Sequence, residues 1–311
     1  MTIEDWQRAD RGNKVCEALK KHITLLDGGM GQELFLRSGK SASPLFSAQA
    51  MIDNPQMVID LHCDFIRAGA ELISLNAYAA TPERLLRDAD ILLFEPLQKA
   101  AVEAALRARE ITEKPVLIAG CLPPLVASYH AELVPPKDQA IESYKRIVEQ
   151  QEAAVDLFIA ETLSSVAEAR YICEVVAKTN KPIWVSFTVN DNDGTLLRSG
   201  ETLKAGVDEA AAANAVGILV NCSTPEAIGQ SMAILSKLDI PFGGMANGYV
   251  SASDLKAGGG VDALATRVDF GQADYADHAL GWADKGATLI GGCCGVSPSH
   301  IAEIRRRIDM T

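Results

Sequence analysis

The sequence lacks the features of a membrane protein or a nucleic-acid-binding protein. No apolar run reaches the roughly 18–20 residues that span a bilayer, and the polar opening MTIEDWQRADRGNK does not resemble a signal peptide. Lys and Arg number 29 against 41 Asp and Glu, and the resulting net charge of −12 argues against a nucleic-acid surface. We therefore expect a cytoplasmic protein that acts on small molecules, with neither nucleic acid nor membrane as a partner.

Several familiar motifs are also missing. No G-x-G-x-x-G turn follows the first apolar run, so dinucleotide binding has no support. The absence of C-x-x-C and H-E-x-x-H disfavours a structural zinc knuckle and a metalloprotease. Seven cysteines without an export signal argue against a disulfide scaffold and favour metal binding or catalysis. We interpret Cys16, Cys63, Cys121 and Cys173 as core packing.

Short apolar runs alternate with longer helical patterns along nearly the whole chain. Most runs are continuously apolar, which is typical of parallel strands covered on both faces. The eight runs are 23–29, 71–78, 115–122, 157–163, 182–189, 217–223, 241–248 and 288–295. Eight strands with intervening helices predict a (β/α)₈ TIM barrel of the α/β class, as a single domain over 1–311. Within it we expect an N-terminal helix over about 3–21 and the barrel over about 22–311; an open doubly wound sheet is the alternative.

Helix signals and two long connections complete this prediction. Asp138 predicts the N-cap of a helix over 138–152, and Ser297 that of a helix over 297–308. Residues 36–56 and 246–272 are longer and richer in Gly, Ser and Pro than a plain crossover requires. Since both follow strand ends, where barrel enzymes place their active sites, they are candidate lids, with surface insertion as the alternative.

Three cysteines follow predicted strands that end at the same mouth of such a barrel. Cys222 follows the sixth strand, and Cys293 and Cys294 follow the eighth. Adjacent cysteines on a regular strand point to opposite faces, so the backbone must leave strand geometry for both to reach one ion. The glycines beside them permit this. Three thiolates suit tetrahedral Zn²⁺ with a fourth position open for substrate; a buried Cys-Cys pair with Cys222 in the core is the alternative.

Several motifs together resemble the homocysteine S-methyltransferase family. They are L-L-D-G-G-M-G-Q-E-L near the start, N-C-S after an apolar run, and G-G-C-C-G followed by V-S-P-S-H-I. The resemblance runs from Leu25 to Ile301. It implies the (β/α)₈ barrel and the zinc ligands Cys222, Cys293 and Cys294, with a zinc-held substrate thiolate as the nucleophile.

The resemblance also implies roles for residues at the other strand ends. Asp27 and Gly28 match the segment that contacts the bound amino acid, and Glu161 matches the acidic residue that positions its ammonium. Asn76 and Asn221 are further candidates for substrate binding, or else satisfy backbone groups. The capping of a loop or helix is the alternative for the two carboxylates.

The family resemblance implies methyl transfer to homocysteine, or to a related thiol or selenol, giving methionine in the first case. It leaves the donor open among S-methylmethionine, S-adenosylmethionine and betaine-like onium compounds. Two other functions also remain open: a homocysteine-activating subunit of a split cobalamin-dependent methionine synthase, with a corrinoid protein partner, and a non-catalytic zinc- or thiol-binding protein. The oligomeric state, including a homo-oligomer, is not predicted.

Overall fold

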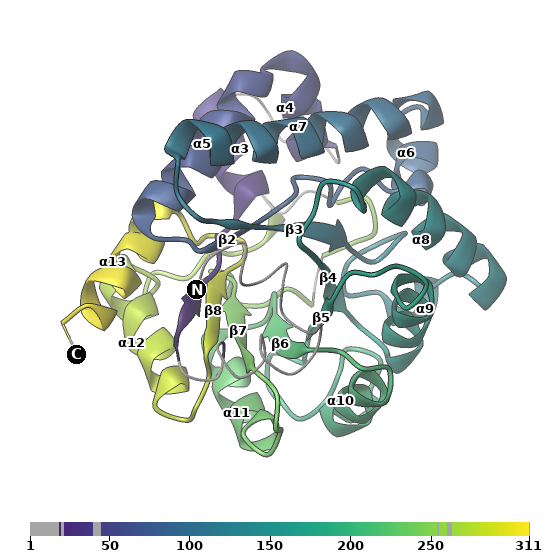
Figure 1. Ribbon diagram of the computed structural model, residues 1–311. Coiled ribbons are helices and arrows are strands. Elements are labelled where there is room, and N and C mark those ends of the chain that lie inside the picture. Colours follow the sequence, from purple (N-terminus) through teal and green to yellow (C-terminus); the bar gives the residue numbers. More distant parts are fainter. Residues whose placement is uncertain (1–18, 20–21, 40–44, 254, 260–262, 311) are drawn as a thin grey trace.

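Eight parallel strands form the wall of a barrel, and helices surround it (Figure 1). The computed structural model describes residues 19, 22–39, 45–253, 255–259 and 263–310. The strands are β1 (Thr24–Leu25), β2 (Leu72–Ser74), β3 (Leu117–Leu122), β4 (Leu157–Leu163), β5 (Ile183–Phe187), β6 (Gly217–Asn221), β7 (Phe242–Ala246) and β8 (Leu289–Gly292). Each lies inside its predicted run, so the single-domain TIM barrel is confirmed.

From β2 to β8 each strand pairs in parallel with the next one in sequence, and β8 pairs with β1. A single parallel bridge between Leu26 and Leu72 closes the ring between β1 and β2. The open doubly wound alternative is therefore wrong, because that fold reverses its strand order at a switch point. Closure aims the carboxyl ends of all eight strands at one mouth.

The helices between the strands cover the outside of the barrel (Figure 1). They are α3 (Met30–Ser38), α4 (Phe46–Asp53), α5 (Pro55–Ala68), α6 (Pro82–Asp88), α7 (Phe94–Thr112), α8 (Lys137–Gln151), α9 (Val166–Val176), α10 (Leu203–Ala212), α11 (Pro225–Leu235), α12 (Gln272–Ala283) and α13 (Pro298–Ile308), with short 3₁₀ turns at Ile91–Leu93 and Ala131–Leu133. None of the helices described is long and apolar enough to cross a membrane. The predicted helix over 3–21 lies, apart from Leu19, outside the described residues.

Two capping predictions have different outcomes. Ser297 is the N-cap of α13 as predicted, and His300 Nδ1 accepts a hydrogen bond from the Ser297 backbone N–H at 3.2 Å. The predicted cap at Asp138 is wrong: α8 begins one residue earlier, Pro136 is its N-cap, and Asp138 lies in the first turn. A carboxylate there still interacts favourably with the helix dipole.

Two apolar layers hold the barrel together. Inside the ring, Trp184 is fully buried among aliphatic side chains from the other strands. Outside it, the strands pack against the helices in a larger continuous core. Cys63 and Cys173 belong to this outer core, as their interpretation as packing residues requires. The strand ends at the mouth are thus set on a rigid frame.

Candidate active site

A cavity of about 290 Å³ opens at the carboxyl ends of the strands. All eight predicted site residues line it: Asp27, Gly28, Asn76, Glu161, Asn221, Cys222, Cys293 and Cys294. These residues come from five strand ends that are up to 267 positions apart in the sequence. The fold therefore brings together what the sequence could only suggest was close.

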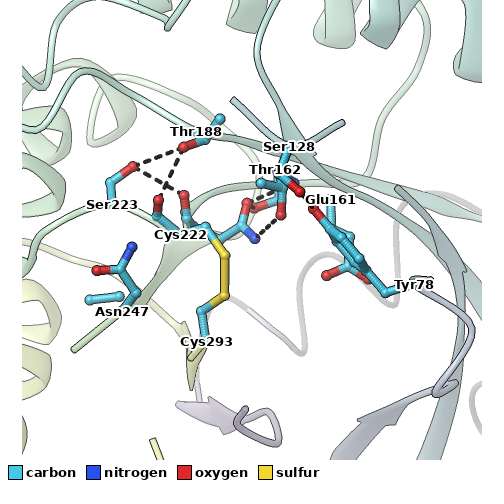
Figure 2. The surroundings of a disulfide bond; sticks show 12 residues. Tyr78, Ser128, Glu161, Thr162, Thr188, Cys222, Ser223, Asn247 and Cys293 are labelled. Atoms are coloured by element: carbon cyan, nitrogen blue, oxygen red, sulfur yellow. Dashed lines mark hydrogen bonds between the residues drawn. A yellow bond between two sulfur atoms is a disulfide. The ribbon is translucent and has the colours of Figure 1, made fainter. Parts of the chain in front are cut away.

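The three cysteines converge, but two of them are joined. Cys222 and Cys293 form a disulfide with their Cα atoms 5.7 Å apart, whereas Cys294 has a free thiol (Figure 2). The sequence predicts thiolates at both positions, and this pairing differs from that prediction. As the chain stands, no cluster of three or more His, Cys, Asp or Glu side chains in its described part is placed to hold a metal.

The same sulfur atoms fit a thiolate-bound metal once the disulfide is reduced. Bond formation between Cys222 and Cys293 requires that their side chains reach a common point, and Cys294 lines the same cavity. Burial raises the pKa of the Cys294 thiol, so the thiolate needs a stabilising cation. Three soft thiolate donors at one point are the set that zinc prefers.

The backbone leaves regular strand geometry at the cysteines, as predicted. Strand β8 ends at Gly292, and Cys293 and Cys294 form a turn that Gly295 completes with a φ of 87°. This left-handed conformation suits glycine. Cys222 also has a positive φ of 49°, which is uncommon for a side chain with a Cβ and occurs at functional sites.

Asn221 connects the end of β6 to the end of β4. Its side-chain oxygen accepts hydrogen bonds from the Thr162 backbone N–H at 2.9 Å and the Ser186 hydroxyl at 2.8 Å. Its Nδ2 donates to Thr162 Oγ1 at 2.8 Å. Since Thr162 and Cys222 both have positive φ values, this amide fixes two strained residues next to Glu161 and the sulfur cluster. Asn76 likewise bonds to protein, donating to the Ser47 carbonyl at 2.8 Å; contact of either amide with substrate stays a prediction.

Asp27, which is buried, and Glu161, which is partly buried, are carboxyl groups of the cavity without an ion-pair partner among the described residues. Burial raises the pKa of Asp27 to about 8. The charge of Glu161 also raises this pKa, whereas a 2.8 Å hydrogen bond from the Ser74 backbone N–H lowers it. Burial also raises the pKa of Glu161, whose Oε1 lies 3.0 Å from the Cys121 Sγ. Cys121 is therefore buried packing, as interpreted, and also a neighbour of the site. Two such carboxyl groups favour a cationic ligand.

Other residues of the cavity escaped sequence analysis. Tyr78, Arg84, Ser128 and Tyr129 line it, and the Tyr78 hydroxyl lies 2.7 Å from the Ser128 Oγ. Leu255 and Gly259 of the predicted loop 246–272 also line it. Of these residues, only Tyr78 belongs to a predicted strand run; the others lie in connections without a recognisable motif.

The fold and this cavity define a barrel enzyme with a cavity lined by cysteines and carboxyl groups at the carboxyl ends of its strands. A family model described as homocysteine S-methyltransferase matches residues 24–308. The chain is 31% identical to the homocysteine S-methyltransferase of Escherichia coli, over 93% of this chain and 96% of that protein, and 29% identical to homocysteine S-methyltransferase 1 of Arabidopsis thaliana, over 91% and 92%.

A solved structure of the E. coli homocysteine methyltransferase MmuM, described as its metallated form, matches with a TM-score of 0.77 and 29% identity, covering 95% of this chain and all of that one. The chain belongs to the homocysteine S-methyltransferase family, whose members are methyltransferases.

Proposed function

We propose that this protein transfers a methyl group from an onium donor to the thiol of homocysteine and that it uses zinc to do so. The observation that carries the proposal is the cavity that unites three cysteines with Asp27 and Glu161, in a chain of this family. A thiol acceptor needs activation, because a free thiol with a pKa near 8.5 is mostly protonated at neutral pH.

The two carboxyl groups would hold the ammonium of the acceptor amino acid. Neither has a cationic partner among the described residues, and each is raised in pKa by burial, so an ammonium placed between them relieves an unfavourable arrangement. Gly28 lets the end of β1 pack closely against the segment after β8, since a Cβ at this position would lie 2.3 Å from the Val296 carbonyl oxygen. The contact of the ammonium with the two carboxylates would orient the acceptor, with its sulfur toward the cysteines.

Cys222, Cys293 and Cys294 would hold the zinc ion in the reduced protein. Bound there, zinc would deprotonate the acceptor thiol and keep it as a nucleophilic thiolate. In the transfer itself, a bond forms between the acceptor sulfur and the methyl carbon. The bond from that carbon to the onium centre breaks, and its electron pair leaves with a neutral product. The carboxylates and thiolates favour a cationic donor.

The test measures zinc and turnover on the same reduced preparation. We expect about one zinc per chain in the wild type and its loss in Cys294→Ala. Cys173→Ala is the matched control, since Cys173 is buried in α9 away from the cavity. Methionine formation is then assayed from homocysteine with S-methylmethionine, S-adenosylmethionine and betaine in turn.

Each outcome distinguishes among the functions that the sequence left open. Zinc together with turnover of one donor supports the proposal and identifies the donor. Zinc without turnover favours a subunit that meets a corrinoid protein, or a non-catalytic thiol-binding protein. Absence of zinc after reconstitution under reducing conditions would contradict the metal assignment.

A further inference from the structure

The cavity has a second polar side that the proposed function does not use. Tyr78, Arg84 and Ser128 line the cavity together. In Figure 2, Tyr78 and Ser128 lie on the side of Glu161, away from the disulfide between Cys222 and Cys293. These side chains come from β2–α6 and the segment after β3, and so from different elements than the cysteines.

Helix α6 places Arg84 at this side. Thr81 is the N-cap of α6, and its hydroxyl accepts a hydrogen bond from the Arg84 backbone N–H at 3.2 Å. The guanidinium then reaches across to the segment after β3. Its Nε and Nη2 donate to the Pro124 carbonyl at 3.3 and 3.1 Å, and Nη2 lies 3.4 Å from the Ser128 Oγ. The group also lies over the ring of Tyr78, 5.1 Å from its centroid, so its position is fixed from several directions.

Arg84 forms no ion pair in the described part of the chain, and its Nη1 donates no hydrogen bond there; Asp88 acts on it only at a distance. Arg87, one turn further along α6, is different. Its guanidinium bonds both oxygens of Asp88, at 2.8 and 2.6 Å, and the Val126 carbonyl at 2.7 Å. Burial lowers the pKa of Arg84, yet a guanidinium remains protonated in proteins. A cation at a cavity wall without an ion-pair partner favours an anionic ligand group.

We propose that Arg84 and the Ser128 hydroxyl bind the carboxylate of the methyl donor and so select donors that carry one. This inference rests on the proposed methyl transfer. Arg84 would repel a purely cationic donor, whereas a zwitterion can direct its onium centre to the sulfur cluster and its carboxylate to the guanidinium. The acceptor's ammonium is already assigned to Asp27 and Glu161. Guanidinium binds carboxylate through paired, charge-assisted hydrogen bonds, which makes it a specificity determinant.

The test compares donors that differ only in the carboxylate. Binding of S-methylmethionine and its carboxamide, and of betaine and its carboxamide, is measured by titration calorimetry on the reduced full-length protein. We expect the wild type to bind at least one zwitterion about 10- to 100-fold more tightly than its amide, the range for charge-assisted hydrogen bonds. Arg84→Gln should remove this preference, and Arg84→Lys should retain part of it.

Arg87→Gln is the matched control, because that side chain shares α6 but already has its carboxylate partner, and it should keep the full preference. The inference is overturned if Arg84→Gln keeps the preference, or if it weakens the binding of the donor and of its carboxamide equally. It is also overturned if this variant raises the KM of homocysteine instead, or if the wild type binds neither zwitterion. A preference without any methyl transfer would uphold the subsite while the proposed function fails. Methyl transfer that is unchanged in Arg84→Gln would uphold the proposed function, while the subsite fails.

Discussion

Glu161 is held in place by neighbours that are not themselves charged. The Cys121 thiol lies 3.0 Å from its Oε1, and the next residue, Thr162, is fixed through Asn221. Substitution by Gln retains the shape of the side chain and removes its charge. We expect Glu161→Gln to raise the KM of homocysteine about 10- to 100-fold, because a charged hydrogen bond to the ammonium is lost.

The control for this variant is Glu149→Gln, which changes an exposed glutamate on α8. It should leave the KM unchanged, and the zinc content of both variants should equal that of the wild type. Steady-state kinetics with homocysteine as the varied substrate provide the measurement. An unchanged KM in Glu161→Gln would show that this carboxylate does not hold the acceptor.

At the residue scale, the sequence predicts the ends of strands well and the connections poorly. Asp27, Glu161 and the cysteines follow apolar runs, so their shared location follows from the barrel itself. Arg84 and Ser128 follow no such rule. Their approach depends on the path of α6 and of the segment after β3, and only tertiary packing determines those paths. The disulfide likewise depends on distances across the cavity that spacing cannot give.

Among the elements, the first turn of α3 lies against the cysteine-bearing turn after β8. A Cβ at Gly29, the N-cap of α3, would lie 2.6 Å from the Cys293 carbonyl oxygen and 3.1 Å from the Cys294 Cα. Both are backbone atoms that cannot rotate away. We expect Gly29→Ala to displace the cysteine turn and reduce the zinc bound per chain.

A neighbouring glycine supplies the comparison for this variant. The nearest atom to a Cβ at Gly31 would be 3.6 Å away, which is an ordinary contact. Gly31→Ala should therefore keep its zinc and gain up to about 1 kcal/mol of helix stability. Zinc content and circular dichroism are measured on both. Full zinc content in Gly29→Ala would contradict the proposed coupling between the two elements.

Helix α9 begins with a buried capping box that responds to pH. Oε2 of Glu168 accepts hydrogen bonds from the Ser164 and Ser165 backbone N–H groups at 2.9 and 3.0 Å. Burial nevertheless raises its pKa from 4.5 to about 7. The folded chain therefore binds more protons than the unfolded chain between about pH 4.5 and 7, and the contribution of Glu168 to stability falls as the pH rises through this window.

Chemical denaturation between pH 4.5 and 7.5 tests this expectation. The wild type should lose up to a few kcal/mol from this group, at about 1.4 kcal/mol for each unit of pKa shift. In Glu168→Gln this loss should be absent, so its curve against pH should be flatter, although the variant also loses part of its cap. Parallel curves for the two proteins would assign the pH dependence to other groups.

The elements themselves were predicted well where apolar pattern determines them. All eight strands lie within their predicted runs, since a parallel strand buried on both faces leaves a continuous apolar segment. Helix starts are less certain, and the cap at Asp138 is an example. There the structure uses Pro136 instead: proline presets the backbone entry, and the aspartate can support the same helix from its first turn.

For the whole molecule, metal binding should appear as stability. Zinc that binds only the folded, reduced chain stabilises it by about 2.7 kcal/mol when free zinc is 100 times its Kd. For a chain of this size that amounts to a rise in Tm of roughly 4 °C. We expect this rise in the wild type by calorimetry under reducing conditions, its reversal by a chelator, and no rise in Cys294→Ala. An equal rise in the variant would assign the effect to a different site.

The seam between β1 and β2 is a place where the barrel can open locally. Among the described residues, the Leu26–Leu72 bridge is the one backbone pairing between these strands, with hydrogen bonds from the Asp27 N–H to the Leu72 carbonyl and from the Glu71 N–H to the Leu25 carbonyl, at 3.0 and 2.7 Å. The Asp27 carboxylate adds a bond from the Ser74 N–H. Asp27 thus belongs both to this narrow seam and to the cavity. A ligand bound to the Asp27 carboxylate would stabilise the seam from the side of the cavity. The amides of Asp27 and Glu71 should therefore exchange with deuterium more slowly once the acceptor is bound. Bound substrate would then stabilise the closure of the barrel between β1 and β2.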